Sequence, residues 1–205
     1  MNIAIYKPGV AGLKSDFISA TGLSWKKEKE VIFTKYFYHP SFHISLRPFS
    51  VQEDMPAIYS WAWKLSRAAN TVAASYLYTG HSDFARSFMA LANNQVPICQ
   101  IDVCSAEKDE LYELYPSTPG DYIIRMLMNT NRKIIRPLHV KALQTCVAYL
   151  FQFPEVSQVI ADPEADNKLY NEILLKAGFQ FETQLYNQYI TNNLFVCNRQ
   201  SFIPS

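Results

Sequence analysis

The segment from residue 156 to residue 179 constrains the fold more than any other part of this 205-residue chain. Its first part, 156–161, is a short apolar run that predicts a strand, and a Pro-containing turn follows it. Asn167 then stands where a helix would begin, because its side-chain oxygen can accept a hydrogen bond from a free N–H of the first turn. Gly178 stands where that helix would end. A new strand begins at Phe179, so the segment predicts strand, helix and strand within a mixed α/β domain.

The composition is that of a folded globular protein and limits the classes of partner. Apolar residues make up 49% of the chain and charged residues 18%, which excludes a disordered chain. A formal net charge of +1 argues against a nucleic-acid partner, which would favour a strongly basic surface. No signal peptide and no apolar run of roughly 18 residues is present, so we expect a soluble, cytoplasmic protein with no membrane contact.

The cysteines indicate neither a disulfide framework nor a metal site. They form no Cys-x-x-Cys pair, and no His lies at ligand spacing from any of them. We therefore expect free thiols in a reducing compartment and no bound metal. The cysteines are Cys99, Cys104, Cys146 and Cys197.

Periodicity and turn residues predict the order β-β-α-α-β-β-α-β-α-β-β, with no repeat or linker that would divide the chain. The first helix is expected to begin with a capping box formed by Ser50 and Glu53. We expect helices at 50–65, 82–93, 138–151 and 167–177. We expect strands at 30–38, 42–47, 96–103, 122–128, 156–161, 179–189 and 193–197.

The strand–helix–strand segment resembles the last motif of the GNAT superfamily of N-acetyltransferases, in which an Asn opens a helix that ends in Gly-Phe. The resemblance implies one domain over residues 1–205, with a central mixed, mostly antiparallel, twisted sheet flanked by helices. It also implies a splay between the fourth and fifth strands, where the pantetheine arm of acetyl-CoA lies. The GNAT-like core would cover 42–202, and residues 1–40 would form an N-terminal extension.

Several short motifs are similar, in the same order, to a narrower group. That group is the acyltransferases of hydroxamate siderophore biosynthesis, which acylate N-hydroxylysine or a similar hydroxylated amine. The motifs are Leu46-Arg47-Pro48-Phe49 with Glu53-Asp54 and Trp61, Pro97-Ile98 with Ile101-Asp102, Pro119-Gly120-Asp121, Leu150-Phe151 with Pro154 and Val156, and Asp162-Pro163-Glu164 with Asp166-Asn167.

The resemblance also implies a site for the acyl-CoA co-substrate. The family binds pyrophosphate in a Gly-rich loop before the central helix, but Pro137 and His139 stand at the positions of the two expected glycines. Charged side chains would compensate for the lost N–H donors, although a solvated basic turn would look the same. Asn167 either binds the pantetheine arm or is only a helix cap. The expected cofactor-binding residues are Met126, Leu127, Met128, Arg132, Lys133, Arg136, Leu138, His139 and Asn167.

The catalytic positions implied by the resemblance also depart from the family. Arg125 stands where the siderophore group has a His, and Glu164 stands where it has an Asp. We expect Glu164 to act as base and Arg125 to hold an oxyanion or a substrate carboxylate. Trp61 and Asp102 are expected to bind the acceptor. Many superfamily members have a Tyr acid at the position of Leu174; Tyr170, one turn away, is expected to pack in the core, and Asp162 to cap the helix or turn.

Three functions follow from these observations. The first is an N-acyltransferase that moves an acyl group, acetyl by preference, from acyl-CoA to an amine or hydroxylamine, as in hydroxamate siderophore biosynthesis. The second is a catalytically degenerate member of the fold that binds a ligand or partner. The third is an aminoglycoside-type acetyltransferase with an acidic acceptor cleft, which the acidic run 107–113 permits. A monomer or a homodimer is expected in each case.

Overall fold

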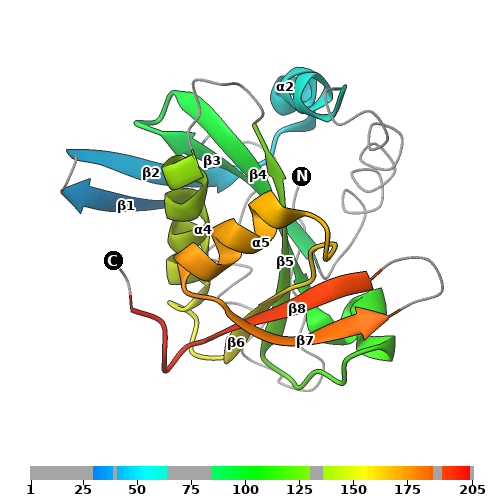
Figure 1. The fold of residues 1–205 in the computed structure, drawn as a ribbon. Coiled ribbons are helices and arrows are strands. Elements are labelled where there is room, and N and C mark those ends of the chain that lie inside the picture. The colour runs from blue at the N-terminus through cyan, green and yellow to red at the C-terminus, as the bar shows by residue number, and fades with distance from the viewer. Residues whose placement is uncertain (1–29, 39–40, 64–84, 130–135, 187–190, 204–205) are drawn as a thin grey trace.

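The computed structural model describes residues 30–38, 41–63, 85–129, 136–186 and 191–203 (Figure 1). Its centre is an eight-stranded sheet of order β1-β2-β3-β4-β5-β6-β8-β7. The strands are β1 Phe33–Tyr38, β2 Ser41–Pro48, β3 Ala85–Ala92, β4 Val96–Ser105, β5 Asp121–Met128, β6 Gln158–Ala161, β7 Gln180–Tyr186 and β8 Thr191–Asn198. The helices are α2 Val51–Trp63, α4 Arg136–Leu150 and α5 Lys168–Ala177, and two short 3₁₀ segments are η2 Ala106–Lys108 and η3 Glu110–Glu113.

The sheet is antiparallel except at one pair of strands. β5 and β6 are parallel, and α4 is the crossover that a parallel connection requires. Their pairing covers three positions and ends at Ile123 with Ile160. β6 ends one residue later, whereas β5 continues to Met128. Among the described strands, none pairs with this edge of β5 over its last residues, which confirms the predicted splay and the mixed, mostly antiparallel sheet.

The helix predicted at 82–93 is wrong, because Ala85–Ala92 forms the central strand β3. All eight residues of β3 are buried, so both faces of the strand contact other parts of the protein. Apolar residues then occur at almost every position, and such a run also satisfies the spacing of a helix. The observed order is β-β-α-β-β-β-α-β-α-β-β for the described elements. Residues 82–84 of the predicted helix lie outside the described residues.

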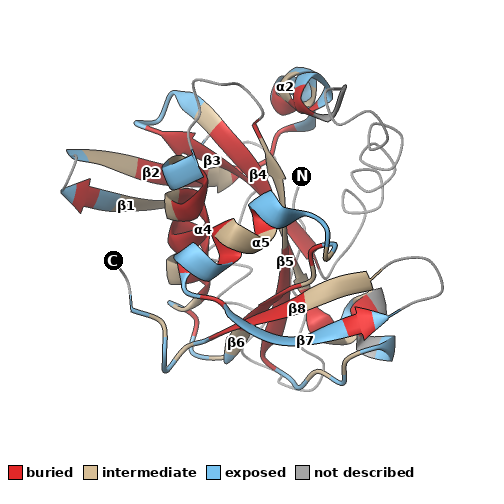
Figure 2. Ribbon diagram, viewed as in Figure 1, coloured by how far each residue is buried: buried red, intermediate tan, exposed pale blue. Residues whose placement is uncertain are grey.

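Two helices cover one face of the sheet. Figure 1 shows α4 and α5 side by side, and the largest buried cluster joins them to the strands, as the burial colours of Figure 2 show. Gly178 ends α5 in the left-handed conformation, with φ of 102°, as predicted. No helix in the described ranges combines the length and apolar character that crossing a membrane requires.

Two smaller apolar clusters lie on the opposite face of the sheet. One joins α2 to the sheet and includes Trp61, Met89 and Leu127. The other joins the 3₁₀ segments to the sheet and includes Leu111 and Ile123. Side chains of a strand alternate between faces, so the side chain of the residue midway between Ile123 and Leu127 lies between these two clusters. That residue is Arg125, and we call the polar gap between the two clusters the polar window.

The start of α2 differs in detail from the predicted capping box. The Ser50 N–H, which the capping box assigns to Glu53, donates to a carboxylate oxygen of Asp54 at 2.9 Å. Asp54 also binds the guanidinium of Arg47 through both of its oxygens, at 2.7 and 2.6 Å. The ion pair of Arg47 and Asp54 therefore joins the end of β2 to the first turn of α2.

Candidate active site

A row of polar side chains crosses the sheet in the window between the two smaller clusters. Arg125 of β5 pairs in register with Asp102 of β4, which pairs with Ser87 of β3. Residues that pair directly point to the same face of a sheet, so the three side chains lie next to one another. The row starts beside the splay, because Arg125 follows the last paired positions of β5 and β6.

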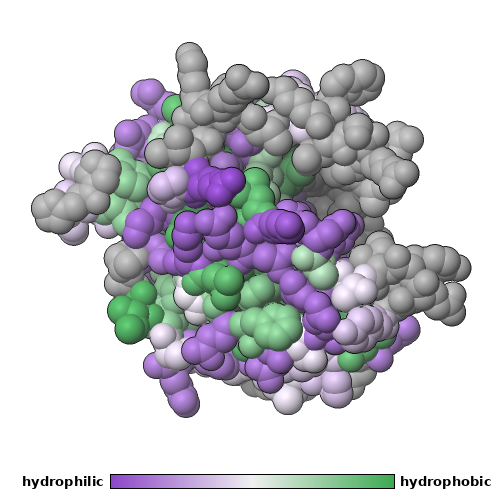
Figure 3. All heavy atoms as spheres, viewed as in Figure 1, coloured by the Kyte–Doolittle hydropathy of each residue, from purple (hydrophilic) through white to green (hydrophobic). Residues whose placement is uncertain are grey.

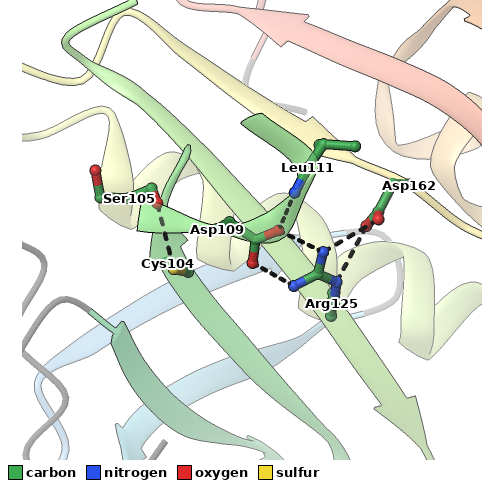
Figure 4. Close-up of polar contacts among 6 residues, drawn as sticks. All are labelled: Cys104, Ser105, Asp109, Leu111, Arg125 and Asp162. Atoms are coloured by element: carbon green, nitrogen blue, oxygen red, sulfur yellow. Dashed lines mark hydrogen bonds and ion pairs between the residues drawn. The ribbon is translucent and has the colours of Figure 1, made fainter. Parts of the chain in front are cut away.

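Two carboxylates hold the guanidinium of Arg125 (Figure 4). Nη1 donates to Asp109 Oδ2 at 2.6 Å, and Nη2 donates to Asp109 Oδ1 at 2.9 Å. Nε and Nη2 donate to the two oxygens of Asp162, each at 3.1 Å. Asp109 is the N-cap of η3, where it also accepts from Leu111 N, and Asp162 directly follows β6. Arg125 therefore joins the 3₁₀ segment to the end of β6.

The charges of this cluster depend on burial and on the ion pairs. Burial opposes the charge of Arg125, but its hydrogen bonds to Asp109 and the charge of Asp162 hold its pKa above the ordinary value. Burial would raise the pKa of Asp109, but the two short bonds from Arg125 lower it below its usual range. Burial raises the pKa of Asp162, and the longer contacts with Arg125 offset this only in part.

Asp102 is the carboxylate of the row that retains hydrogen-bonding capacity. Its Oδ1 accepts from Ser87 Oγ and, at 2.7 Å, from Gln100 Nε2. Its Oδ2 accepts no hydrogen bond from the described part of the chain, and the residue is partly exposed. Burial raises the pKa of Asp102, against the lowering effect of these hydrogen bonds and of Arg125. A carboxylate with a raised pKa is suited to accept a proton.

A match of the amino-acid sequence to a family model identifies the family of this chain. Residues 52–186 match the family model described as an acetyltransferase (GNAT) domain. The chain belongs to the GNAT acetyltransferase family. A comparison with curated protein sequences gave no significant match.

Solved structures share this GNAT fold at low sequence identity. An uncharacterised protein from Bacillus halodurans aligns with a TM-score of 0.67 and 20% identity, over 83% of this chain and 91% of that one. The aminoglycoside acetyltransferase AAC(6')-Ib, in complex with coenzyme A and kanamycin, gives 0.66 and 22%, over 77% and 96%. Mycobacterium smegmatis RimJ, in complex with CoA-disulfide, gives 0.55 and 11%, over 77% and 83%. None of these similarities supports the siderophore subgroup.

The residues of the motif after β6 have different contacts from those expected from the sequence. Asp162, expected to cap the helix or turn, binds Arg125 instead, and Asn167 caps α5 by accepting from Tyr170 N at 3.2 Å. Glu164 is exposed, and its backbone oxygen accepts from Asn171 Nδ2 at 3.0 Å. The role of Glu164 as base stays a prediction. With both of its carboxylate partners in place, Arg125 is poorly suited to hold a substrate anion.

Asp109 and Asp162, whose carboxylates bind Arg125, were not predicted as site residues from the sequence. They lie 16 and 37 residues away from Arg125 along the chain, and no spacing rule connects them. A signal did exist, because an Arg on an apolar strand must find acidic partners if it is to be buried. Asp109 lies in the acidic run 107–113 and Asp162 lies in the turn after a predicted strand. Both were therefore available as candidates.

The predicted cofactor residues of the GNAT core lie at the splay and at the start of α4. Met126 and Met128 pack toward the cluster under α4, and Leu127 packs toward α2. Arg136, the first residue of α4, is exposed and donates to Glu172 of α5 at 2.9 Å. Leu138 is half-buried. Arg132 and Lys133 lie outside the described residues.

Three other predicted residues are buried. Burial of His139 lowers its pKa, against the raising effect of backbone groups of Asn129 and Ile98, which disfavours the charge expected to bind phosphate. Trp61 lies in the cluster under α2, so its role in acceptor binding stays a prediction. Tyr170 is buried in the main core, as expected, and its hydroxyl has no hydrogen-bond partner among the described residues.

A groove of about 170 Å³ lies between α4 and α5. Its floor is apolar and its rim carries cations, and Figure 3 shows hydrophilic side chains in a band across this side of the molecule. It is lined by Arg136, Pro137, Val140, Lys141, Glu172, Ile173 and Lys176. Glu172 pairs with Arg136 and with Lys176, so the three cations and one acid of the rim leave a net positive charge. An apolar floor with such a rim is suited to an aromatic, anionic group. Within the described residues, no group of three or more His, Cys, Asp or Glu is placed to hold a metal ion.

Proposed function

We propose that this GNAT protein transfers an acyl group, acetyl by preference, from acyl-CoA to the amine of a small cationic molecule. The observation that supports it is the position of the Ser87–Asp102–Arg125 row directly beside the splay of β5 and β6. An amine bound at this row would lie next to the backbone edge of β5 that has no strand partner. The acyl donor and the acceptor would then meet at one place on the sheet.

The residues present fit an acyl-CoA. The unpaired edge of β5 offers backbone N–H and C=O groups to an extended pantetheine arm, as a neighbouring strand would. The side-chain amide of Asn167 uses its oxygen for the helix cap, which leaves its NH₂ group for the arm. Pro137 lies in the first turn of α4, where the missing N–H matters least, and Arg136 supplies positive charge.

The described residues supply positioning and a proton acceptor. In the proposed reaction the amine nitrogen attacks the thioester carbon, the N–C bond forms and the C–S bond breaks, with the electron pair leaving on sulfur. The bound ammonium gives one proton to Asp102 before the attack, and Asp102 releases it to water. The second proton leaves the nitrogen after the N–C bond forms and passes to the thiolate. Orientation of the two reactants and polarisation of the carbonyl by a β5 N–H contribute most of the rate.

The charge of the site favours a cationic acceptor over an anionic one. Asp102, Asp109 and Asp162 carry three formal negative charges and Arg125 one positive charge, which leaves two negative charges. An ammonium group is attracted by such a site and a carboxylate is repelled. A hydroxylamine of the siderophore type remains a narrower prediction, carried by the motifs alone. An aminoglycoside-type acceptor likewise remains a prediction from the sequence, carried by the acidic run 107–113.

Calorimetric titration with acetyl-CoA at low and at physiological salt tests the proposal. We expect a Kd in the micromolar range, weakened about tenfold by Arg136→Ala, which removes a charge-assisted contact. The exposed Lys108 lies outside the α4–α5 groove, so Lys108→Ala is the charge-matched control and should leave the Kd unchanged. Turnover would then be measured with simple amines and with N-hydroxylysine.

The degenerate loop before α4 favours a second function, that of a binding protein without catalysis. Both expected glycines are replaced, by Pro137 and by the buried His139. If neither acetyl-CoA nor longer acyl-CoAs bind, the acyltransferase proposal fails and this second function is left.

A further inference from the structure

The carboxylates around Arg125 are covered, and the guanidinium is what an incoming ligand meets. The side chain of Arg125 is 42% exposed, whereas those of Asp109 and Asp162 are 9% and 10% exposed. A ligand that approaches the window from solvent therefore contacts a fixed cation before it reaches either acid.

Asp109 and Asp162 also have little capacity left for a substrate. Each of their four carboxylate oxygens accepts a hydrogen bond from Arg125, and Asp109 Oδ1 accepts a further one from Leu111 N. A second cation could bind them only by competing with a bidentate guanidinium, which is a strong and well-oriented partner. Asp102 differs, because Ser87 and Gln100 both donate to its Oδ1 and no residue in the described ranges donates to its Oδ2.

We propose that Arg125 is a specificity-determining residue that restricts the acceptor to a molecule with a single cationic group near the reacting amine. Asp102 binds that amine, and Arg125 occupies the place where a second ammonium group of a polyamine would otherwise bind. The inference rests on the proposed function, since it names the class of amine that the same site accepts. It sets this site apart from one that selects polycationic acceptors by an open cluster of acids.

The physical reason is that Arg125 changes both the number of open anions and the sign of the nearest charge. With Arg125 present, the single ammonium group of a monoamine binds the carboxylate of Asp102. A triamine that binds in the same way must place its other ammonium groups beside the guanidinium of Arg125. Like charges a few ångströms apart in a partly desolvated site repel strongly. Without Arg125, a triamine finds three carboxylates within one window. The ratio of affinities for triamine and monoamine therefore measures the role of Arg125.

The test is a calorimetric comparison of butylamine, putrescine and spermidine, with one, two and three amino groups, in low salt and in the presence and absence of CoA. We expect the wild-type protein to bind spermidine within about threefold of butylamine. Arg125→Gln should bind spermidine at least about tenfold tighter than the wild type, with little change for butylamine. Arg125→Lys should restore the wild-type ratio, and Asp102→Asn should remove butylamine binding.

Controls separate a loss of charge selection from a loss of structure. Glu182→Gln removes an exposed acid on β7 and should leave all three affinities unchanged. If Arg125→Gln does not fold, the double variant Arg125→Gln with Asp162→Asn replaces it. The second substitution removes the buried charge of Asp162, which has lost its partner, and Asp109 remains available to bind an ammonium group. That double variant should also favour spermidine, by a smaller factor.

The proposal is overturned if the wild type already binds spermidine tenfold tighter than butylamine. It is also overturned if the folded glutamine variants keep the wild-type ratio, or if the wild type binds no amine. These results are distinct from failure of the proposed function, which is read from acetyl-CoA binding and turnover. Charge-selective amine binding without acetyl-CoA binding would sink the acyltransferase proposal and leave the role of Arg125 intact.

Discussion

Asp102 shows at the residue scale how burial can prepare a carboxylate for chemistry. Its neighbours Ser87 and Gln100 both donate to Oδ1, which fixes the side chain and leaves Oδ2 to accept from a substrate. Partial burial raises its pKa and so makes the carboxylate a better base than an exposed Asp. Glu164, the base expected from the motif, lies exposed outside this row.

We therefore expect Asp102→Asn to lower kcat by about 10²-fold or more, the usual worth of a positioned general base, while Glu164→Gln changes kcat by less than about threefold. The pH profile of kcat/KM should fall on the acid side, with an apparent pKa above the ordinary value for Asp, because the base must be deprotonated. Steady-state rates with a simple amine acceptor check both points. Equal losses in the two variants, or a larger loss in Glu164→Gln, would return the role of base to Glu164.

The same substitution should affect stability in the opposite direction. The pKa of Asp102 is raised in the folded protein, so its contribution to stability is greatest below the unfolded pKa and is lost as pH rises through the folded pKa. At pH 7 the ionised, partly buried carboxylate is then unfavourable. Asn at this position keeps an oxygen acceptor without the charge, so the Tm of Asp102→Asn at pH 7 should be no lower than that of the wild type.

At the scale of elements, the junction of β2 and α2 depends on one buried ion pair. Arg47 and Asp54 are 13% and 7% exposed, and Asp54 accepts from the N–H of Ser50 as well as from Arg47. The pair places α2 over the sheet, where Ile58 and Trp61 pack against Met89. This cluster borders the polar window, so a change at the start of α2 should also affect the position of the site residues.

Asp54→Ala should lower the free energy of unfolding by about 3–5 kcal/mol, because it leaves the buried guanidinium of Arg47 without its carboxylate and removes the cap of α2. The exposed Asp166→Ala, with the same change of side chain, is the control and should cost less than about 1 kcal/mol. Urea denaturation followed by circular dichroism measures both. Similar costs for the two variants would mean that the pair of Arg47 and Asp54 does not stabilise the start of α2.

At the scale of the whole molecule, the sequence predicts the parts of the fold that local signals determine. The unit 156–179 was predicted because an apolar run, an Asn cap and a glycine stop lie close together in the chain. β3 was taken for a helix because burial on both faces removes the alternation that distinguishes a strand. The contacts of Arg125 with Asp109 and Asp162 depend on how β5, β6 and η3 come together, which no local pattern in the chain encodes.

The four cysteines offer a measure of stability for the whole molecule. Cys99, Cys146 and Cys197 are buried and lie on β4, α4 and β8. Burial raises the pKa of Cys146 and of Cys197 to about 12 and raises that of Cys99 well above its ordinary value. Cys104 is only partly buried, and burial together with Asp109 raises its pKa to about 12 as well. A thiol reagent should therefore react slowly with the native protein, since the thiolate is the reactive species.

We expect the three buried cysteines to be labelled at one common rate, because their elements share the main core and become accessible only on global unfolding. A ligand that binds only the native state lowers the unfolded population, so acetyl-CoA at 100 times its Kd should slow this labelling about 100-fold. Mass spectrometry of each cysteine over time provides the measurement, and AMP at the same concentration is the control ligand. Protection of Cys197 without Cys99 and Cys146 would show that the terminal hairpin opens on its own. Unchanged rates with acetyl-CoA would count against a cofactor site in this fold.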